Sequence, residues 1–281
     1  FPKDIKAEKK NIIQLYEAVS VELGDTPFEI FYINMSPAAR SPRWLVYKHE
    51  PVAHEARYTC TEDIEKYLGI SFDDNEFDPE ELITAIEIVM PKLEKLYNSK
   101  VRHYVVKQHT LLVCRQFEKY AFELNTKVMN IDLMRLVLAM HDIGKAIDRA
   151  TQHIYTQSLI REFWSESPFT DYELKLVEAL LKDDHLGKFF QGKYDCNMLQ
   201  EEIKKDAEEL QIDASCLLQL KMVLYQCDIA SYTKDAGGLR YLEHMFVYEN
   251  NEKTFDEENG LLSMSADYWS RYEQLKSVIY E

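Results

Sequence analysis

The sequence predicts a mainly α fold: a helical bundle with a small strand-containing appendage at its N-terminus. The 281 residues include only eight glycines and eight prolines, whereas β-sandwiches and barrels need turn residues at short intervals. From Pro79 onward, apolar side chains recur at the three- and four-residue spacing of amphipathic helices. We therefore expect an N-terminal region over 1–78, with a helix and a short strand and loop segment, followed by an all-α domain over 79–281.

The N-terminal region begins with a helical pattern and continues into a β-prone stretch. Apolar residues follow helical spacing over 4–23. Two short runs of β-branched and aromatic residues follow, 28–33 and 44–47, separated by a loop that contains two Ser-Pro steps. We interpret 27–60 as the only strand region, either a hairpin or an irregular appendage. A short helix is expected next, over 61–68, because threonine is a good N-cap and acidic residues occupy the first turn.

The rest of the chain is almost wholly helical in pattern. The predicted helices cover 79–99, 102–125, 131–141, 152–163, 170–182, 197–210, 214–233, 237–246 and 265–280. The segment 248–262 is polar, and we expect it to be an exposed loop. No internal repeat or low-complexity linker interrupts this region.

The composition argues against several classes of protein. The formal net charge of −16 opposes contact with an extended phosphate backbone, so we expect no nucleic acid partner. A small anionic substrate is still compatible with this charge if a metal or a local cation reverses the field in the site. The five cysteines form no CxxC pair, which disfavours a disulfide framework. No apolar run approaches the roughly 20 residues that span a bilayer, so we expect a cytoplasmic protein that does not enter the membrane.

The sharpest chemical feature is the pair His141-Asp142 at the end of an apolar helix. Residues 136–140 are all apolar, so this helix is too hydrophobic to lie on a surface, and Gly144 gives the chain a place to turn. An unpaired carboxylate buried at this point would be strongly disfavoured by desolvation. Asp142 therefore needs a cation, which is either a metal ion or the side chain of Lys145.

Two further residues on predicted core faces can complete a metal site. His109 faces inward from an apolar helix stripe, although a core hydrogen bond to a carbonyl group would also explain it. Asp228 shares a helix face with Leu217, Leu220 and Leu224, and its alternative explanation is capping or a salt bridge. Two imidazoles and two carboxylates form a mixed nitrogen and oxygen site that suits Mn, Fe, Ni, Zn or Mg.

The order His109, His141-Asp142, Asp228 resembles the HD superfamily of metal-dependent phosphohydrolases. The resemblance covers roughly residues 100 to 245 and includes the block from His141 to Lys145. It implies an HD-type helical bundle that binds one divalent metal ion, or two. The implied activity is hydrolysis of a small phosphate ester, of a nucleotide or a related phosphodiester. It further implies that Asp142 binds the metal and orients the attacking water, and that Lys145 holds a substrate phosphate. An equally good explanation for Lys145 is that its positive charge stabilises the negative end of the helix dipole.

Other residues near the motif extend the predicted site. His185 lies between the His-Asp pair and Asp228 in the sequence, where HD-type proteins carry a ligand for a second metal or a catalytic histidine. We therefore predict His185 as a fifth metal ligand or a catalytic residue. Asp184 beside it is a predicted acid or base, with a solvated helix end as the alternative. Besides Lys145, the cations predicted to bind the substrate are Lys234, Arg240 and Arg102. A glycine pair between the first two permits close backbone approach, but a turn explains it equally well.

Two alternative functions fit the same residues. The first is a di-iron HD-type oxygenase, in which additional histidines, here His185 and His153, would hold the second iron. The second is a non-catalytic HD-fold binding protein. In that case the region 25–60, with Trp44 and two Ser-Pro steps, is a contact surface for a protein partner or for a second copy in a homodimer.

Overall fold

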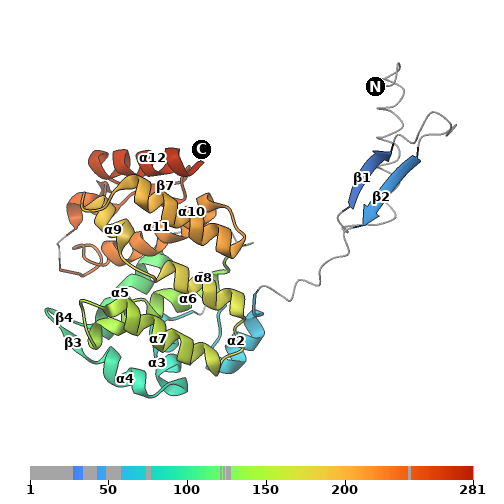
Figure 1. The fold of residues 1–281 in the computed structure, drawn as a ribbon. Coiled ribbons are helices and arrows are strands. Elements are labelled where there is room, and N and C mark those ends of the chain that lie inside the picture. Colours follow the sequence, from blue (N-terminus) through green and yellow to red (C-terminus); the bar gives the residue numbers. More distant parts are fainter. Residues whose placement is uncertain are drawn as a thin grey trace. The chain divides into compact units, whose positions relative to one another are not determined.

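The computed structural model describes residues 28–33, 43–48, 58–73, 77–120, 122, 124, 128–239 and 242–280. The chain divides into two compact units, residues 1–56 and residues 57–281. In the first unit, β1 (Phe28–Ile33) and β2 (Arg43–Lys48) form an antiparallel hairpin with Phe28 opposite Lys48 (Figure 1). The two strands predicted here are thereby confirmed. The helix predicted over 4–23 lies outside the described residues.

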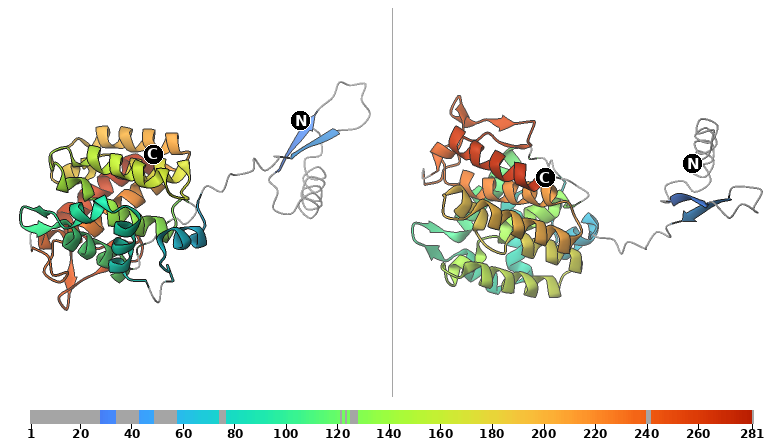
Figure 2. Two further views of the ribbon diagram at one scale, coloured as in Figure 1. Left: turned by 90° about the horizontal axis from the view of Figure 1, so that it is seen from below. Right: turned by 45° about the horizontal axis from the view of Figure 1, so that its top comes forward.

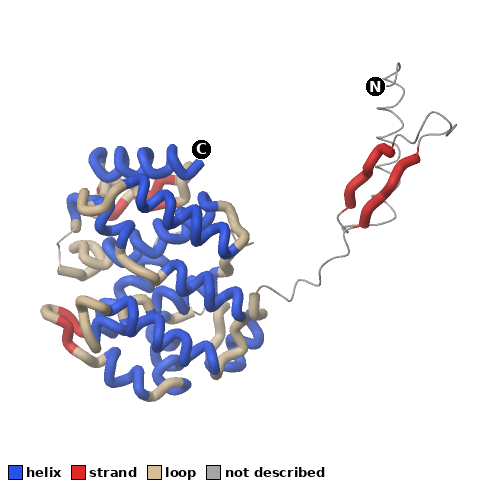
Figure 3. Tube along the Cα trace, viewed as in Figure 1, coloured by secondary structure: helices blue, strands red, loops and turns tan. Residues whose placement is uncertain are grey.

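The second unit is mainly helical, as predicted, and its strands are short (Figure 3). Its α-helices are α2 (Thr61–Leu68), α3 (Pro79–Val89), α4 (Lys92–Tyr97), α5 (Val106–Lys119), α6 (Ile131–Met140), α7 (Gln152–Ser165), α8 (Asp171–Leu180), α9 (His185–Phe190), α10 (Cys196–Leu210), α11 (Ala214–Ala230) and α12 (Ala266–Tyr280). The 3-10 helices are η1 (Ile143–Ala146) and η2 (Glu243–Met245). The strand pairs are β3 (Lys100–Val101) with β4 (Tyr104–Val105), β5 (Tyr248–Glu249) with β6 (Glu252–Lys253), and β7 (Phe255–Asp256) with β8 (Leu261–Leu262).

Helix α6 lies in the core of this unit. Every residue from Asp132 to Met140 is buried, and Asn130 caps the helix by accepting a hydrogen bond from the Leu133 N–H. α6 packs against α3 and α5, and α5 packs in turn against α11. α12 packs on α10 and α11, as two further views show (Figure 2). The core therefore holds α5, the end of α6 and α11 in fixed relative positions.

Helix boundaries depart from the prediction where the local signal is weak. The helix predicted over 79–99 is split into α3 and α4, because Pro91 lacks the N–H group that a continuous helix needs. The pattern does not predict α9, since its six residues are too few to show a period. The helix predicted over 237–246 is wrong in the described part of that segment, where η2 is the helical element.

The segment 248–262 is not the exposed loop that its polarity predicts. It forms β5 to β8, and Leu261 and Leu262 are fully buried with β8 packed against α11. Lys253 is buried as well, because its ammonium group is paired inside the protein. The expectation that strands occur only within 27–60 is therefore wrong.

The helical unit begins earlier than residue 79, where the sequence predicts its start. Ile64 and Leu68 of α2 are buried in its core, as is Phe72. The Arg135 guanidinium group on α6 donates a hydrogen bond to the carbonyl oxygen of Phe72. Residues 58–73 therefore pack as part of the helical unit.

Candidate metal centre

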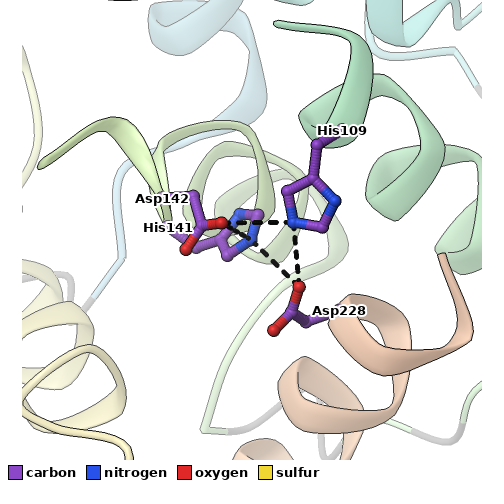
Figure 4. A group of neighbouring side chains, drawn as sticks. All are labelled: His109, His141, Asp142 and Asp228. Atoms are coloured by element: carbon purple, nitrogen blue, oxygen red, sulfur yellow. Dashed lines mark ion pairs between the residues drawn. The ribbon is translucent and has the colours of Figure 1, made fainter. Parts of the chain in front are cut away.

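Four side chains from three parts of the helical unit converge on one point (Figure 4). His109 comes from α5, His141 and Asp142 from the junction of α6 and η1, and Asp228 from α11. We call them the His/Asp quartet. One ligand atom from each residue lies within 4.8 Å of the others. His109 Nε2 is 3.1 Å from Asp142 Oδ2 and 2.9 Å from Asp228 Oδ1, and His141 Nε2 is 3.6 Å and 3.7 Å from the same oxygens.

The quartet is buried except on one side. The exposed fraction is 3% for His109 and for Asp142, and 9% for His141. The Asp228 side chain is 28% exposed, so it is the member of the quartet that solvent reaches most. A ligand entering from solvent would meet the quartet from the side of Asp228.

Gly144 permits the turn that presents Asp142. A Cβ atom at this position would lie 2.2 Å from the Gln152 carbonyl oxygen and 2.6 Å from Thr156 Oγ1. Instead, the Gly144 N–H donates a hydrogen bond to Thr156 Oγ1, which holds η1 against α7. Only glycine allows this close approach, so the turn that the sequence predicts at Gly144 has a packing reason.

Hydrogen bonds behind the two imidazoles fix their orientation. His141 Nδ1 donates to the Leu138 carbonyl oxygen at 2.7 Å, which directs the lone pair of Nε2 toward the quartet. His109 Nδ1 is 3.2 Å from Ser231 Oγ, and this hydroxyl donates to the Asp228 carbonyl oxygen at 2.6 Å. The hydroxyl therefore accepts from His109 Nδ1, so Nε2 of His109 is also directed inward. Metal-binding histidines are held by such bonds to their outer nitrogen.

Two buried polar atoms of the quartet, His141 Nε2 and Asp228 Oδ1, make no well-formed hydrogen bond to the described residues, and the Asp228 oxygen has the ion-pair contact with His109 Nε2 in its place. Leaving such atoms unpaired is costly in a protein interior. Both face the centre of the quartet (Figure 4), where a divalent ion would satisfy them together with His109 and Asp142. The quartet can therefore bind a metal ion. Its donor set is compatible with Mn, Fe, Ni, Zn or Mg and does not select among them.

The charges in the quartet are strongly coupled. Burial would lower the pKa of His109, but its contacts with the Asp142 and Asp228 carboxylates raise it to about 9. Burial would raise the pKa of Asp142, but the charges of Lys145 and His141 and the His109 hydrogen bond hold it below its usual value. Contacts with His109 and His141 likewise outweigh burial and hold the pKa of Asp228 well below its usual value. At neutral pH the metal-free quartet therefore carries a proton on His109 that a metal ion must displace.

Metal affinity is expected to rise with pH. The pKa of His109 is raised from 6.5 to about 9, so its proton stabilises the metal-free fold at low pH and is lost as the pH rises through that value. Release of one proton raises the apparent association constant by about tenfold per pH unit, from roughly pH 7 up to roughly pH 9. Competition titrations of Mn²⁺ against a chelator at several pH values in this range measure the slope. A flat profile would contradict the assignment of His109 as a ligand.

A cavity of about 1060 Å³ is lined in part by three members of the quartet, His141, Asp142 and Asp228. Of the predicted substrate-binding cations, Lys145 and Arg102 line it, and Lys145 forms an ion pair with Asp142. The Lys234 side chain is exposed and does not line the cavity, so the prediction for this residue is not supported by its position. Arg240 lies outside the described residues.

His185 and Asp184 line the same cavity without contributing to the quartet. His185 belongs to a second group that could hold an ion, with Glu202 and Asp183. Asp184 is the N-cap residue of α9. Its position in the cavity removes part of its hydration, and this loss, together with the charge of Asp228, raises its pKa. The structure thus places both residues near the quartet but does not make His185 its fifth ligand.

Some contacts around the quartet are not predicted from the sequence. Tyr232 stacks on the His109 ring at 4.7 Å between centroids, and its Oη is 3.2 Å from His109 Nε2. Ser231 and Tyr232 follow Asp228 by three and four positions, which is the spacing of neighbours on one helix face. That spacing could have identified them. Glu202 had no such signal, because its partner His185 lies on another helix.

Comparison with protein-family models, with curated proteins and with solved structures gave no match. The resemblance to the HD superfamily therefore rests on the sequence motif. Among the described helices, none is both long enough and apolar enough to cross a membrane.

Proposed function

We propose that this chain is an HD-type metal-dependent hydrolase of a small phosphate ester. One observation carries the proposal: the ligand atoms of two histidines and two aspartates converge at the wall of a cavity that Lys145 also lines. Phosphoryl transfer requires positive charge around the phosphate oxygens and an activated nucleophile. A metal ion in the quartet and the adjacent lysine would supply the charge.

Asp142 would serve as both metal ligand and orienting group. The quartet residues would hold a divalent ion, and that ion would supply the chemistry of a Lewis acid, activating water and polarising a phosphoryl oxygen. Asp142 is fixed by His109 and Lys145 and is 3% exposed, so its carboxylate has one well-defined position from which to accept a hydrogen bond from the attacking water. Its place at the end of α6 is equally fixed, because the core surrounds that helix.

Lys145 is placed to bind the phosphate. Its side chain is 14% exposed and lines the cavity while its ammonium group pairs with Asp142. Burial would lower the pKa of Lys145, but the charges of Asp142 and Asp228 raise it above its usual value. The side chain therefore stays cationic at physiological pH. If a metal ion also bound the Asp142 carboxylate, the Lys145 ammonium group would be able to donate one of its hydrogen bonds to a phosphate oxygen of the substrate.

The test is metal content followed by phosphate release. The purified protein is analysed for metals by mass spectrometry, and phosphate release is then measured from a panel of phosphate monoesters and diesters with Mn²⁺ or Mg²⁺. The proposal expects turnover that requires the metal and stops with a chelator. Bound iron with dioxygen uptake would favour the oxygenase instead. Metal without any turnover would favour a binding protein.

Removal of the Lys145 cation is expected to weaken phosphate binding. In the Lys145→Met variant, kcat/KM should fall by about 10- to 100-fold, because a hydrogen bond to a charged group contributes about 1.5–3 kcal/mol. Lys188 lines the same cavity, but its side chain is exposed. Among the described residues, no hydrogen bond or ion pair joins Lys188 to the quartet. Lys188→Met is therefore the matched control. Equal losses in the two variants would show that general cavity charge, and not Lys145, binds the phosphate.

A further inference from the structure

The hydroxyl group of Tyr232 lies beside the inward-facing nitrogen of His109. The two rings are stacked, with 4.7 Å between centroids and an interplanar angle of 27°, and Tyr232 Oη is 3.2 Å from His109 Nε2. Tyr232 lines the same cavity as Asp142 and Asp228. The stacked phenol lies over the face of the imidazole, whereas the Nε2 lone pair lies in the imidazole plane. The hydroxyl therefore lies to one side of the direction in which Nε2 would bind an ion.

The turn that follows α11 holds Tyr232 in this position. Its N–H donates a hydrogen bond to the Ile229 carbonyl oxygen at 3.1 Å. The Gly238 backbone packs directly on the same turn, so closely that a Cβ atom at Gly238 would lie 1.8 Å from the Ser231 carbonyl oxygen. The Gly238 N–H also donates to the carbonyl oxygen of Thr233, which is fully buried. The hydroxyl is thus placed before any ligand enters, and pre-positioned donors stabilise developing charge without reorganisation.

The hydroxyl has a proton to donate to a ligand in the cavity. His109 Nε2 would use its lone pair for the ion, so it could not also accept a hydrogen bond from Tyr232. The other hydroxyl within reach belongs to Tyr104, whose ring centroid is 6.2 Å from that of Tyr232. Burial raises the pKa of both phenols, and a hydrogen bond between their hydroxyls contributes to each shift. Two phenol protons share that one hydrogen bond, so one proton is left over.

We propose that the Tyr232 hydroxyl donates a hydrogen bond to a non-bridging oxygen of the substrate's phosphoryl group. This inference rests on the proposed hydrolysis and adds a neutral donor to the Lys145 cation. In the transition state of phosphoryl transfer, negative charge is spread over three equatorial oxygens. A donor already fixed beside one of them stabilises that charge. The phenol keeps its proton throughout, so the contact makes and breaks no covalent bond and needs no further acid or base.

Tyr232→Phe separates this role from packing, because it keeps the ring on His109 and removes only the hydroxyl. With 4-nitrophenyl phosphate and Mn²⁺, kcat/KM should fall by about 10- to 100-fold, mostly through kcat, since one hydrogen bond to a charged group is lost in the transition state. The affinity for Mn²⁺, measured by calorimetric titration, should change by less than about threefold, well below the loss expected for a group that supports a metal ligand.

Tyr225→Phe is the matched control. Tyr225 lines the same cavity from α11, but its ring stacks on Phe190 with 5.0 Å between centroids. Its loss of a hydroxyl should change kcat/KM by less than about threefold. Orthovanadate binding then tests the contact without turnover, because vanadium accepts a fifth oxygen as phosphorus does in the transition state. In the Mn²⁺-loaded protein, Tyr232→Phe should weaken orthovanadate binding by at least about tenfold and weaken inorganic phosphate binding less.

Three results would overturn the inference. A fall of about tenfold or more in Mn²⁺ affinity in Tyr232→Phe would make the hydroxyl a support for His109. Equal losses in Tyr225→Phe and Tyr232→Phe would reflect the general polarity of the cavity. A larger loss in Tyr104→Phe than in Tyr232→Phe would make Tyr104 the donor. A failure of the proposed function looks different: the unmodified protein would then bind orthovanadate through Tyr232 but hydrolyse no phosphate ester with any divalent metal.

Discussion

The Asp228→Asn variant is expected to lose stoichiometric metal binding. Asp228 contributes one of the two carboxylates of the quartet, and its Oδ1 lies 2.9 Å from His109 Nε2 and 3.7 Å from His141 Nε2. An amide keeps the shape but loses the charge that offsets the metal's charge. Changes in groups that only support metal ligands already cost 10- to 100-fold in affinity, so loss of this ligand should cost at least about 100-fold. Calorimetric titration with Mn²⁺ measures the change.

Asp184→Asn is the matched control for this variant. Asp184 is also a carboxylate that lines the cavity, and the charge of Asp228 contributes to its raised pKa. It is not part of the quartet. Its replacement should leave the metal stoichiometry unchanged and reduce the affinity by no more than a few-fold, through the loss of one nearby negative charge. If both variants lose metal to the same extent, general negative potential holds the ion and the quartet is not its site.

The quartet could be predicted from sequence because its signals are local. Residues 136–140 are apolar without interruption, so the sequence alone shows that the adjacent His141 and Asp142 are buried. His109 and Asp228 lie on apolar helix faces, and the core brings those faces together as the motif order implies. The convergence of the four residues is a finding of the structure; their role in hydrolysis stays a prediction.

The remainder depends on contacts between segments far apart in the chain, which periodicity does not encode. Glu202 orients His185 from a different helix. Leu261 and Leu262 are buried although their segment is polar, because β8 packs on α11. The average polarity of that segment reflects its exposed residues and does not indicate which of its other residues are buried. The same argument applies to Lys253, whose burial is explained only by its distant partners.

Lys253 joins the two helices that carry His109 and Asp228. Its ammonium group is 3.0 Å from Gln116 Oε1 on α5 and 2.8 Å and 2.6 Å from the Asp235 carboxylate oxygens, and its side chain is fully buried. Gln116 lies on the helix that bears His109, and Asp235 lies in the turn that follows α11. Burial lowers the pKa of Lys253, although the Asp235 carboxylate opposes this shift. The ion pair therefore fixes the spacing of α5 and the end of α11 from outside the site.

Lys253→Met is expected to lower the free energy of unfolding by about 3–5 kcal/mol, because it leaves the largely buried Asp235 carboxylate without the cation that pairs with it. The melting temperature should fall by roughly 10 °C for a unit of this size. Lys119→Met removes an exposed lysine from its pair with Glu252 and should change the stability by less than about 1 kcal/mol. Adding Asp235→Asn to Lys253→Met removes the uncompensated charge and should recover at least half of the lost stability, as calorimetric scans can show. Without such recovery, the loss would come from packing around the lysine stem and not from the charge pair.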